Sequence, residues 1–187
     1  KSGADPYLYP NTEWFDMALK KLSLQHQYNL SVSGSARNRI RYFISGSYIN
    51  QVTLLNHEDV FRSNYGVNSK FDRFNFRSNI DVQATDYFAV RVDLASRIEK
   101  RIGPSTSFGN IFSMITSRLP SSQAVFNPDG TRAAGSNLEM PTAYTPNPYG
   151  ELTQSGYYDK THTVKYGTIS AKYDFSSITE GLSAQAN

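Results

Sequence analysis

The feature that most constrains this chain is a set of long segments in which apolar and polar side chains alternate. Successive side chains of a β-strand point to opposite faces of the sheet. Alternation over ten or more residues therefore predicts a strand with one apolar and one polar face. Six segments follow this pattern, the last of them cut short by the end of the chain: 24–34, 39–50, 72–83, 87–99, 163–175 and 182–187.

The length of these segments separates two classes of β protein. Strands of soluble proteins are most often about 5–6 residues long, whereas transmembrane strands need about 9–11. In 72–83 and 87–99 the polar positions hold Arg, Asp and Glu, and the apolar positions are almost free of charge. The pattern favours a wall between lipid and water. Composition alone, with 39% hydrophobic and 13% aromatic residues, still favours a soluble β-sandwich.

The connections between the segments alternate between short and long. Short turns are expected at 34–38, 84–86 and 176–181, and long loops at 51–71 and 100–162. Outer-membrane barrels have short periplasmic turns and long extracellular loops. We therefore expect an all-β chain, a segment of a large antiparallel transmembrane β-barrel. In this reading residues 1–23 form an extracellular loop, and residues 24–187 form part of the barrel.

One helix is expected before the first strand, over residues 12–22. Asn11 or Thr12 could cap it, and acidic residues lie in its first turn and lysines in its last. Trp14, Ala18 and Leu22 recur at a spacing of four residues, which places them on one helix face.

Several function classes receive no support from the sequence. The net charge of +3 is too small and the basic residues too scattered for a nucleic-acid partner. The chain has no cysteine and no apolar run of the ~20 residues that a membrane helix needs. His26, His57 and His162 lack metal-ligand spacing, and no catalytic constellation is apparent. We expect neither an enzyme nor a cofactor or metal. Because the chain begins at Lys1 and ends within a strand pattern, we expect a piece of a longer protein.

Short motifs in the chain resemble those of one protein family. They are NTEWFD at 11–16, YNLSVSG at 28–34, RYFISGSY at 41–48 with NQ at 50–51, FNFRSNID at 74–81, NPDG at 127–130 and ITEGLS at 178–183. In this order they resemble the early barrel of SusC/RagA-type TonB-linked outer-membrane transporters. One departure is Gly34-Ser35 in the first turn, where the family usually has two glycines.

The resemblance implies a 22-stranded barrel filled by an N-terminal plug, of which this chain would supply about six strands. It also implies a location in the outer membrane and active import of glycans, oligosaccharides or peptides. Two protein partners are implied as well. A SusD-like lipoprotein would cover the extracellular face, and TonB would bind a segment that this chain does not contain.

Charged residues at the polar positions form the first candidate site, a luminal wall. They are Arg73, Arg77, Asp81, Arg91, Asp93, Arg97 and Glu99. If the strands 72–83 and 87–99 pair around Asp86, Asp81 faces Arg91 and Arg73 faces Glu99. The lining could guide substrate. The simpler interpretation, which we favour, is a wall of ordinary ion pairs against plug or water.

The long loop 100–162 is the better candidate for function. Its residues 111–115 are expected to form a short helix. Four tyrosines of this loop could stack on sugar rings, contact the SusD-like lipoprotein (the lid), or only pack the loop itself. They are Tyr144, Tyr149, Tyr157 and Tyr158.

Three functions are therefore weighed. The first is a nutrient transporter energised through TonB. The second is a soluble β-rich carbohydrate-binding module, and the third is a structural or adhesin-like outer-membrane barrel.

Overall fold

The computed structural model describes residues 5–7, 9–56, 69–133 and 146–187. The chain divides into two compact units. The sheet unit comprises residues 25–51, 71–100 and 160–187, and the loop unit comprises residues 1–24, 52–70 and 101–159.

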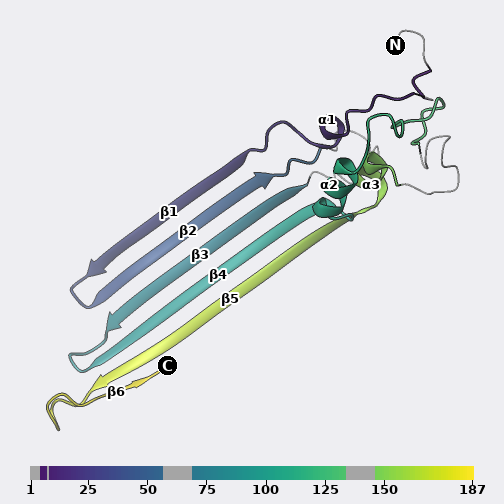
Figure 1. Ribbon diagram of the computed structural model, residues 1–187. Helices are drawn as coiled ribbons and strands as arrows, with labels where there is room; N and C mark the ends of the chain where they lie inside the picture. The colour runs from purple at the N-terminus through teal and green to yellow at the C-terminus, as the bar shows by residue number, and fades with distance from the viewer. Residues whose placement is uncertain (1–4, 8, 57–68, 134–145) are drawn as a thin grey trace. The chain divides into compact units, whose positions relative to one another are not determined.

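Six antiparallel strands make a single sheet, with each strand beside its neighbours in chain order (Figure 1). The strands are β1 (Gln25–Ala36), β2 (Ile40–Val52), β3 (Lys70–Gln83), β4 (Phe88–Pro104), β5 (Tyr157–Asp174) and β6 (Ser183–Ala186). The first five have 12 to 18 residues, longer than the ~9–11 that cross a bilayer. The all-β fold expected from the alternation is confirmed.

Strand pairing keeps the two kinds of side chain apart. In the register of β1 with β2, Tyr28 lies opposite Tyr48 and Val32 opposite Ile44, while Ser31 lies opposite Ser45. Because a shift by one residue would turn every side chain to the other face, this register sets the division between the two faces. Phe43, opposite Ser33, and Ile49, opposite Gln27, are exceptions on the polar side.

A tight turn joins β1 to β2. Arg37 and Asn38 both have left-handed backbone conformations, with φ of 51° and 55°. Two consecutive residues with positive φ are what a type I′ hairpin turn needs, and the twist of that turn matches the twist of the strands. Asn tolerates this conformation well, whereas Arg adopts it at a steric cost.

Two strands reach further than the alternation indicates. β4 continues to Pro104 and β5 begins at Tyr157, so both enter the segment expected to be loop. The Ser105 N–H donates to the Gly156 carbonyl at 2.9 Å, just beyond these strand ends. Backbone pairing does not require alternating side chains, and the sequence pattern therefore misses these residues.

The loop unit holds the helices α1 (Trp14–Ala18), α2 (Phe108–Thr116) and α3 (Pro148–Gln154), which contact one another. Ile111 and Ile115 of α2 and Leu152 of α3 are fully buried, together with Trp14 and Ala18 of α1. The helix expected at 111–115 is confirmed. The described residues contain no helix with the length and apolar character that a membrane crossing needs.

The helix expected over 12–22 is shorter than predicted. Its N-cap is Glu13, which makes no side-chain cap, and its C-cap Leu19 is extended. Leu19 pairs with Leu55, and the Lys20 N–H donates to the Leu54 carbonyl at 2.6 Å. Pairing with the segment around Leu55 thus replaces the last predicted turn of the helix, residues 19–22. Leu22 lies beyond the helix and is exposed.

Candidate functional site

Ionisable side chains gather on one face of the sheet, here called the charged face. Its members are Arg41, Arg73, Arg77, Asp81, Arg91, Asp93, Arg97, Glu99 and Lys172. Arg91 donates to Asp81 through Nε at 2.6 Å and through Nη2 at 3.2 Å. Arg73 Nε lies 3.0 Å from Glu99 Oε1. Both ion pairs predicted from the sequence are therefore present.

Further contacts repeat this register along β3 and β4. The Asn79 amide donates to the Asp93 carboxylate, between the two ion pairs. Arg97 adds a second cation to Glu99, with Nε 3.5 Å from Oε1. The three carboxylates of this face are thus each paired with neighbours on the same sheet, while its six cations leave the face with an excess of positive charge.

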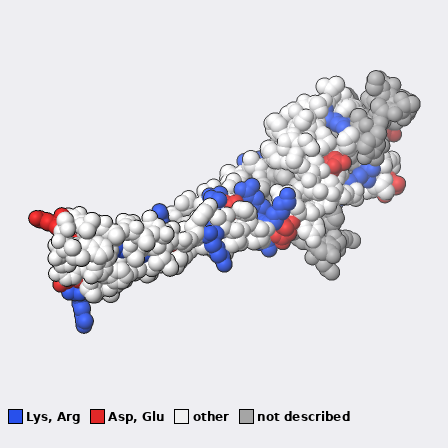
Figure 2. All heavy atoms as spheres, turned by 90° about the horizontal axis from the view of Figure 1, so that it is seen from below, with Lys and Arg blue, Asp and Glu red and all other residues white. Residues whose placement is uncertain are grey.

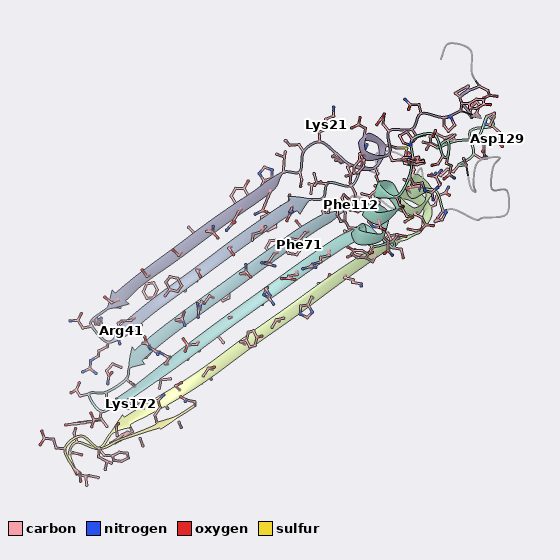
Figure 3. All side chains as sticks on the ribbon, viewed as in Figure 1. Lys21, Arg41, Phe71, Phe112, Asp129 and Lys172 are labelled. Carbon is pink, nitrogen blue, oxygen red and sulfur yellow. The ribbon has the colours of Figure 1, made fainter. Side chains whose placement is uncertain are left out.

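A groove of about 720 Å³ lies on the charged face. Arg41 of β2 and Lys172 of β5 contribute to its lining, with the Asp81–Arg91 pair between them in the strand order. Arg41 and Lys172, which are both labelled in Figure 3, lie at the same end of the sheet. The lining is mostly polar, as expected for a surface in contact with water.

The opposite face of the sheet, here called the apolar face, carries large apolar side chains. They include Tyr28, Leu30, Val32, Tyr42, Ile44, Phe74, Phe76, Ile80, Val92, Leu94, Ile98, Ile169 and Tyr173. Leu30 is 73% exposed and Ile169 is 66% exposed. In the view of Figure 2, Lys, Arg, Asp and Glu form small separate groups among uncharged residues. So many exposed large apolar side chains on one sheet face are unusual on a soluble monomer.

Aromatic rings form a row near one end of the apolar face. Tyr28 stacks with Tyr48 at 6.4 Å between ring centroids, and Tyr48 stacks with Phe74 at 4.5 Å. The Tyr48 hydroxyl donates to Asp72 at 2.8 Å, and the Asn50 amide donates to the same carboxylate oxygen at 2.7 Å. Such a row, apolar on one side and hydrogen-bonded on the other, is typical of the aromatic girdle where lipid meets water.

The structure describes three of the four candidate tyrosines of the long loop. Tyr149 lies on α3, where it packs against Phe126 at 5.5 Å between centroids and under the Arg132 guanidinium. Tyr158 lies across Gly103, because a Cβ added there would come within 2.8 Å of its hydroxyl. Tyr157 is 47% exposed. Tyr144 lies outside the described residues.

Two arginines of the loop unit were missed by the sequence reasoning. Arg118 donates to the Gln123 side chain and to the Pro146 carbonyl, which ties distant parts of the loop together. Burial lowers the pKa of Arg118 and of Arg132, because a charged group loses solvation inside the protein. No local signal marks these residues, since their role depends on contacts far along the chain.

A second missed feature is a cluster of three phenylalanines. Phe112 packs against Phe108 at 6.0 Å and edge-on against Phe15 at 6.2 Å, and all three rings are partly exposed. Within the described residues no three His, Cys, Asp or Glu side chains come close enough together to hold a metal ion.

No protein-family model matches this chain. A TonB-dependent receptor P26 of Formosa agariphila is 30% identical over 129 residues, which cover 68% of this chain and 11% of that protein. This chain is a distant relative of TonB-dependent receptors. A TonB-dependent receptor P3 of the same organism is 27% identical over 175 residues, which cover 88% of this chain and 15% of that protein.

The relationship to TonB-dependent receptors agrees with the geometry of the sheet. The chain spans less than a sixth of the length of these two relatives, at 11% and 15%. The antiparallel sheet, with long strands in chain order, is consistent with a segment of a β-barrel wall.

Proposed function

We propose that this chain forms part of the barrel wall of an outer-membrane TonB-dependent transporter. The observation that carries the proposal is the pair of unlike faces on one sheet. Leu30 and Ile169 on the apolar face are largely exposed, whereas Arg91 and Asp81 pair on the other face. A barrel wall between lipid and an aqueous lumen needs this division.

The competing proposal of a soluble carbohydrate-binding module fits this division poorly. A soluble sheet would bury its apolar face under a second layer. Within the residues described, Val32, Phe74 and Phe76 on that face remain exposed. In lipid the same exposure is favourable, because the side chains meet hydrocarbon rather than water.

Spin labels on neighbouring residues test the assignment of the two faces. The chain has no native cysteine, so single substitutions such as Leu30→Cys and Ser31→Cys introduce unique labelling sites within it. In the full-length protein in lipid vesicles, we expect the label at 30 to collide with oxygen and the label at 31 with a water-soluble nickel chelate. The pair Phe76→Cys and Arg77→Cys on β3 should repeat this contrast. Equal access of the nickel chelate to positions 30 and 31 would contradict the lipid-facing assignment.

We further propose that the transporter is of the SusC/RagA type and imports glycans, oligosaccharides or peptides beneath a SusD-like lipoprotein. The support is the series of sequence motifs from 11–16 to 178–183. Isolation of the full-length protein under mild detergent should bring the lipoprotein with it. Uptake of the nutrient should stop when either the transporter or TonB is deleted. Uptake that continues without TonB would refute active import.

Within that transporter we propose that Tyr144, Tyr149, Tyr157 and Tyr158 contribute to contact with substrate or lid, and that the charged face lines the lumen. Tyr157 is the most direct candidate of the described tyrosines, because it is exposed at the start of β5. Tyr158 covers Gly103 and so also has a structural role. We expect Tyr157→Ala to weaken substrate uptake or lid affinity without loss of protein in the membrane. Normal uptake and normal lid binding in this variant would remove Tyr157 from the site.

A further inference from the structure

A notch of about 440 Å³ interrupts the apolar face between β1 and β4. Its lining is contributed by side chains of the apolar face and by backbone between them: Tyr28, Asn29, Leu30, Gly46, Ser47, Tyr48, Phe74, Asn75, Phe76, Ser96 and Ile98. Leu30, Phe74 and Phe76 at its border are all exposed. The notch is therefore open on the side that we assign to lipid.

Gly46 creates the notch because nothing covers it. A Cβ built on Gly46 would have the Asn75 carbonyl oxygen at 4.0 Å as its nearest neighbour. Other glycines of the sheet are covered by a neighbouring side chain. The Tyr42 ring lies across Gly34, with its hydroxyl 2.6 Å from an added Cβ, and Leu94 Cδ2 lies 3.4 Å from one at Gly167.

The two ends of the notch differ in polarity. At one end the Tyr48 hydroxyl of the lining donates to the Asp72 carboxylate, to which Asn50 also donates, and both Asn50 and Asp72 lie beyond the lining. Away from that end, Leu30 and Phe76 offer only hydrocarbon. A matching occupant has a polar end and a narrow apolar tail. A second copy of the sheet would present separate side chains such as Leu30, not one continuous narrow tail.

We infer that the notch binds one acyl chain of a membrane lipid, whose polar end lies toward Tyr48 and Asn50. The inference rests on the proposed function, because it requires the apolar face to lie in a membrane. Gly46 makes room for the chain, and the rings of Phe74 and Phe76 flank it. The hydrocarbon tail fills a gap that protein side chains leave open, which restores van der Waals contact along the wall.

Native mass spectrometry of the full-length protein tests this inference. The protein is reconstituted with phosphatidylethanolamine, extracted in detergent and stripped of lipid stepwise. We expect one phosphatidylethanolamine to remain on the native protein after the other lipids have left. Gly46→Leu fills the notch and should abolish this last bound lipid. Ala36→Leu adds the same group to an exposed position on the same face, outside the notch, and should leave it bound.

A second substitution guards against a folding defect in Gly46→Leu. Ser96→Leu narrows the notch from β4 and should also lower lipid retention, by at least tenfold in the fraction of protein that carries lipid. Equal retention by native protein and both notch variants would overturn the inference. A protein dimer that is lost in Gly46→Leu would overturn it as well, since the occupant would then be a second copy. The spin labels could show oxygen access at position 30 while lipid retention is unchanged in every variant. That result would refute lipid binding in the notch and would still support the assignment of the apolar face to lipid.

Discussion

Asp81 on β3 and Arg91 on β4 form a bidentate pair, with Arg91 Nε at 2.6 Å from one carboxylate oxygen and Nη2 at 3.2 Å from the other. Side chains meet in this way when they face each other, or nearly so, across neighbouring strands. The pair supports a register of β3 against β4 in which Asp81 faces Arg91, and the contact of Arg73 with Glu99 supports the same register nearer the other end of these strands.

The first prediction concerns the interaction between these two charges. Asp81→Arg places two cations opposite each other and should lower the thermal stability of the full-length protein in detergent. The combined exchange Asp81→Arg with Arg91→Asp restores opposite charges and should recover most of that loss. The expected effect is only a few degrees, because the side chains are partly exposed and water screens them. Thermal unfolding of the native, single and double variants measures the coupling. Additive losses in the double variant would show that the pair contributes nothing.

The second prediction concerns the turn between β1 and β2. Arg37→Gly should raise stability by roughly 0.5–1 kcal/mol, because glycine adopts positive φ without steric cost. Asn38→Val should lower stability by about 1–2 kcal/mol, because a β-branched residue is strained there. Urea-dependent unfolding of the protein in lipid vesicles measures both. Ser35→Gly is the control, since Ser35 belongs to β1 and gains nothing from glycine. Stabilisation by both glycine substitutions would indicate an effect unrelated to the turn.

The third prediction concerns the core of the loop unit. Ile111 is fully buried, and Ile111→Ala should destabilise this unit by about 2–5 kcal/mol through the cavity it leaves. Phe112, the next residue on α2, is 43% exposed, and Phe112→Ala should cost less. Hydrogen exchange of the backbone amides of α2 and α3 in the full-length protein reports the difference. Equal loss of protection in the two variants would argue against the core described here.

The fourth prediction concerns the pH dependence of the turn at 127–131. The hydroxyl and backbone N–H of Thr131 both donate to Asp129, and these hydrogen bonds lower the pKa of its carboxyl group. Figure 3 shows Asp129 in the loop unit. Because the folded pKa lies below the unfolded pKa, the stabilisation is complete above the unfolded value of about 3.9. It is lost as the pH falls through the folded pKa. Hydrogen exchange at Thr131 should accelerate below that range relative to unstructured controls.

Asp129→Asn provides the matched comparison for this prediction. The amide keeps an acceptor oxygen for Thr131 but cannot ionise near pH 4. We expect its turn to show no pH-dependent loss of protection in the acidic range. If Asp129→Asn loses protection at acidic pH to the same extent as the native protein, another group causes the pH dependence.

Sequence periodicity predicted the number and order of the strands and the alternation of their side chains, but it missed the ends of β4 and β5. Alternation with a period of two is a local property, and it survives whatever the strand pairs with. Once a short turn near Asp86 is assumed, antiparallel geometry also predicts the partners Asp81–Arg91 and Arg73–Glu99. These predictions needed no knowledge of the loops.

The tertiary structure alone decided the features that depend on distant contacts. The segment around Leu55 ends α1 at Ala18, although local propensity continues the helix to residue 22. Arg118 and Tyr158 take their positions from Pro146 and Gly103, which lie far away in the chain. The sequence alone does not show which strand glycines are covered by a neighbouring side chain and which are open. Only the packed sheet shows that Gly34 is covered by Tyr42 and that Gly46 is open. The alternation along the chain predicts which face of the sheet a side chain occupies. The residues of neighbouring strands determine whether the space beside it is filled.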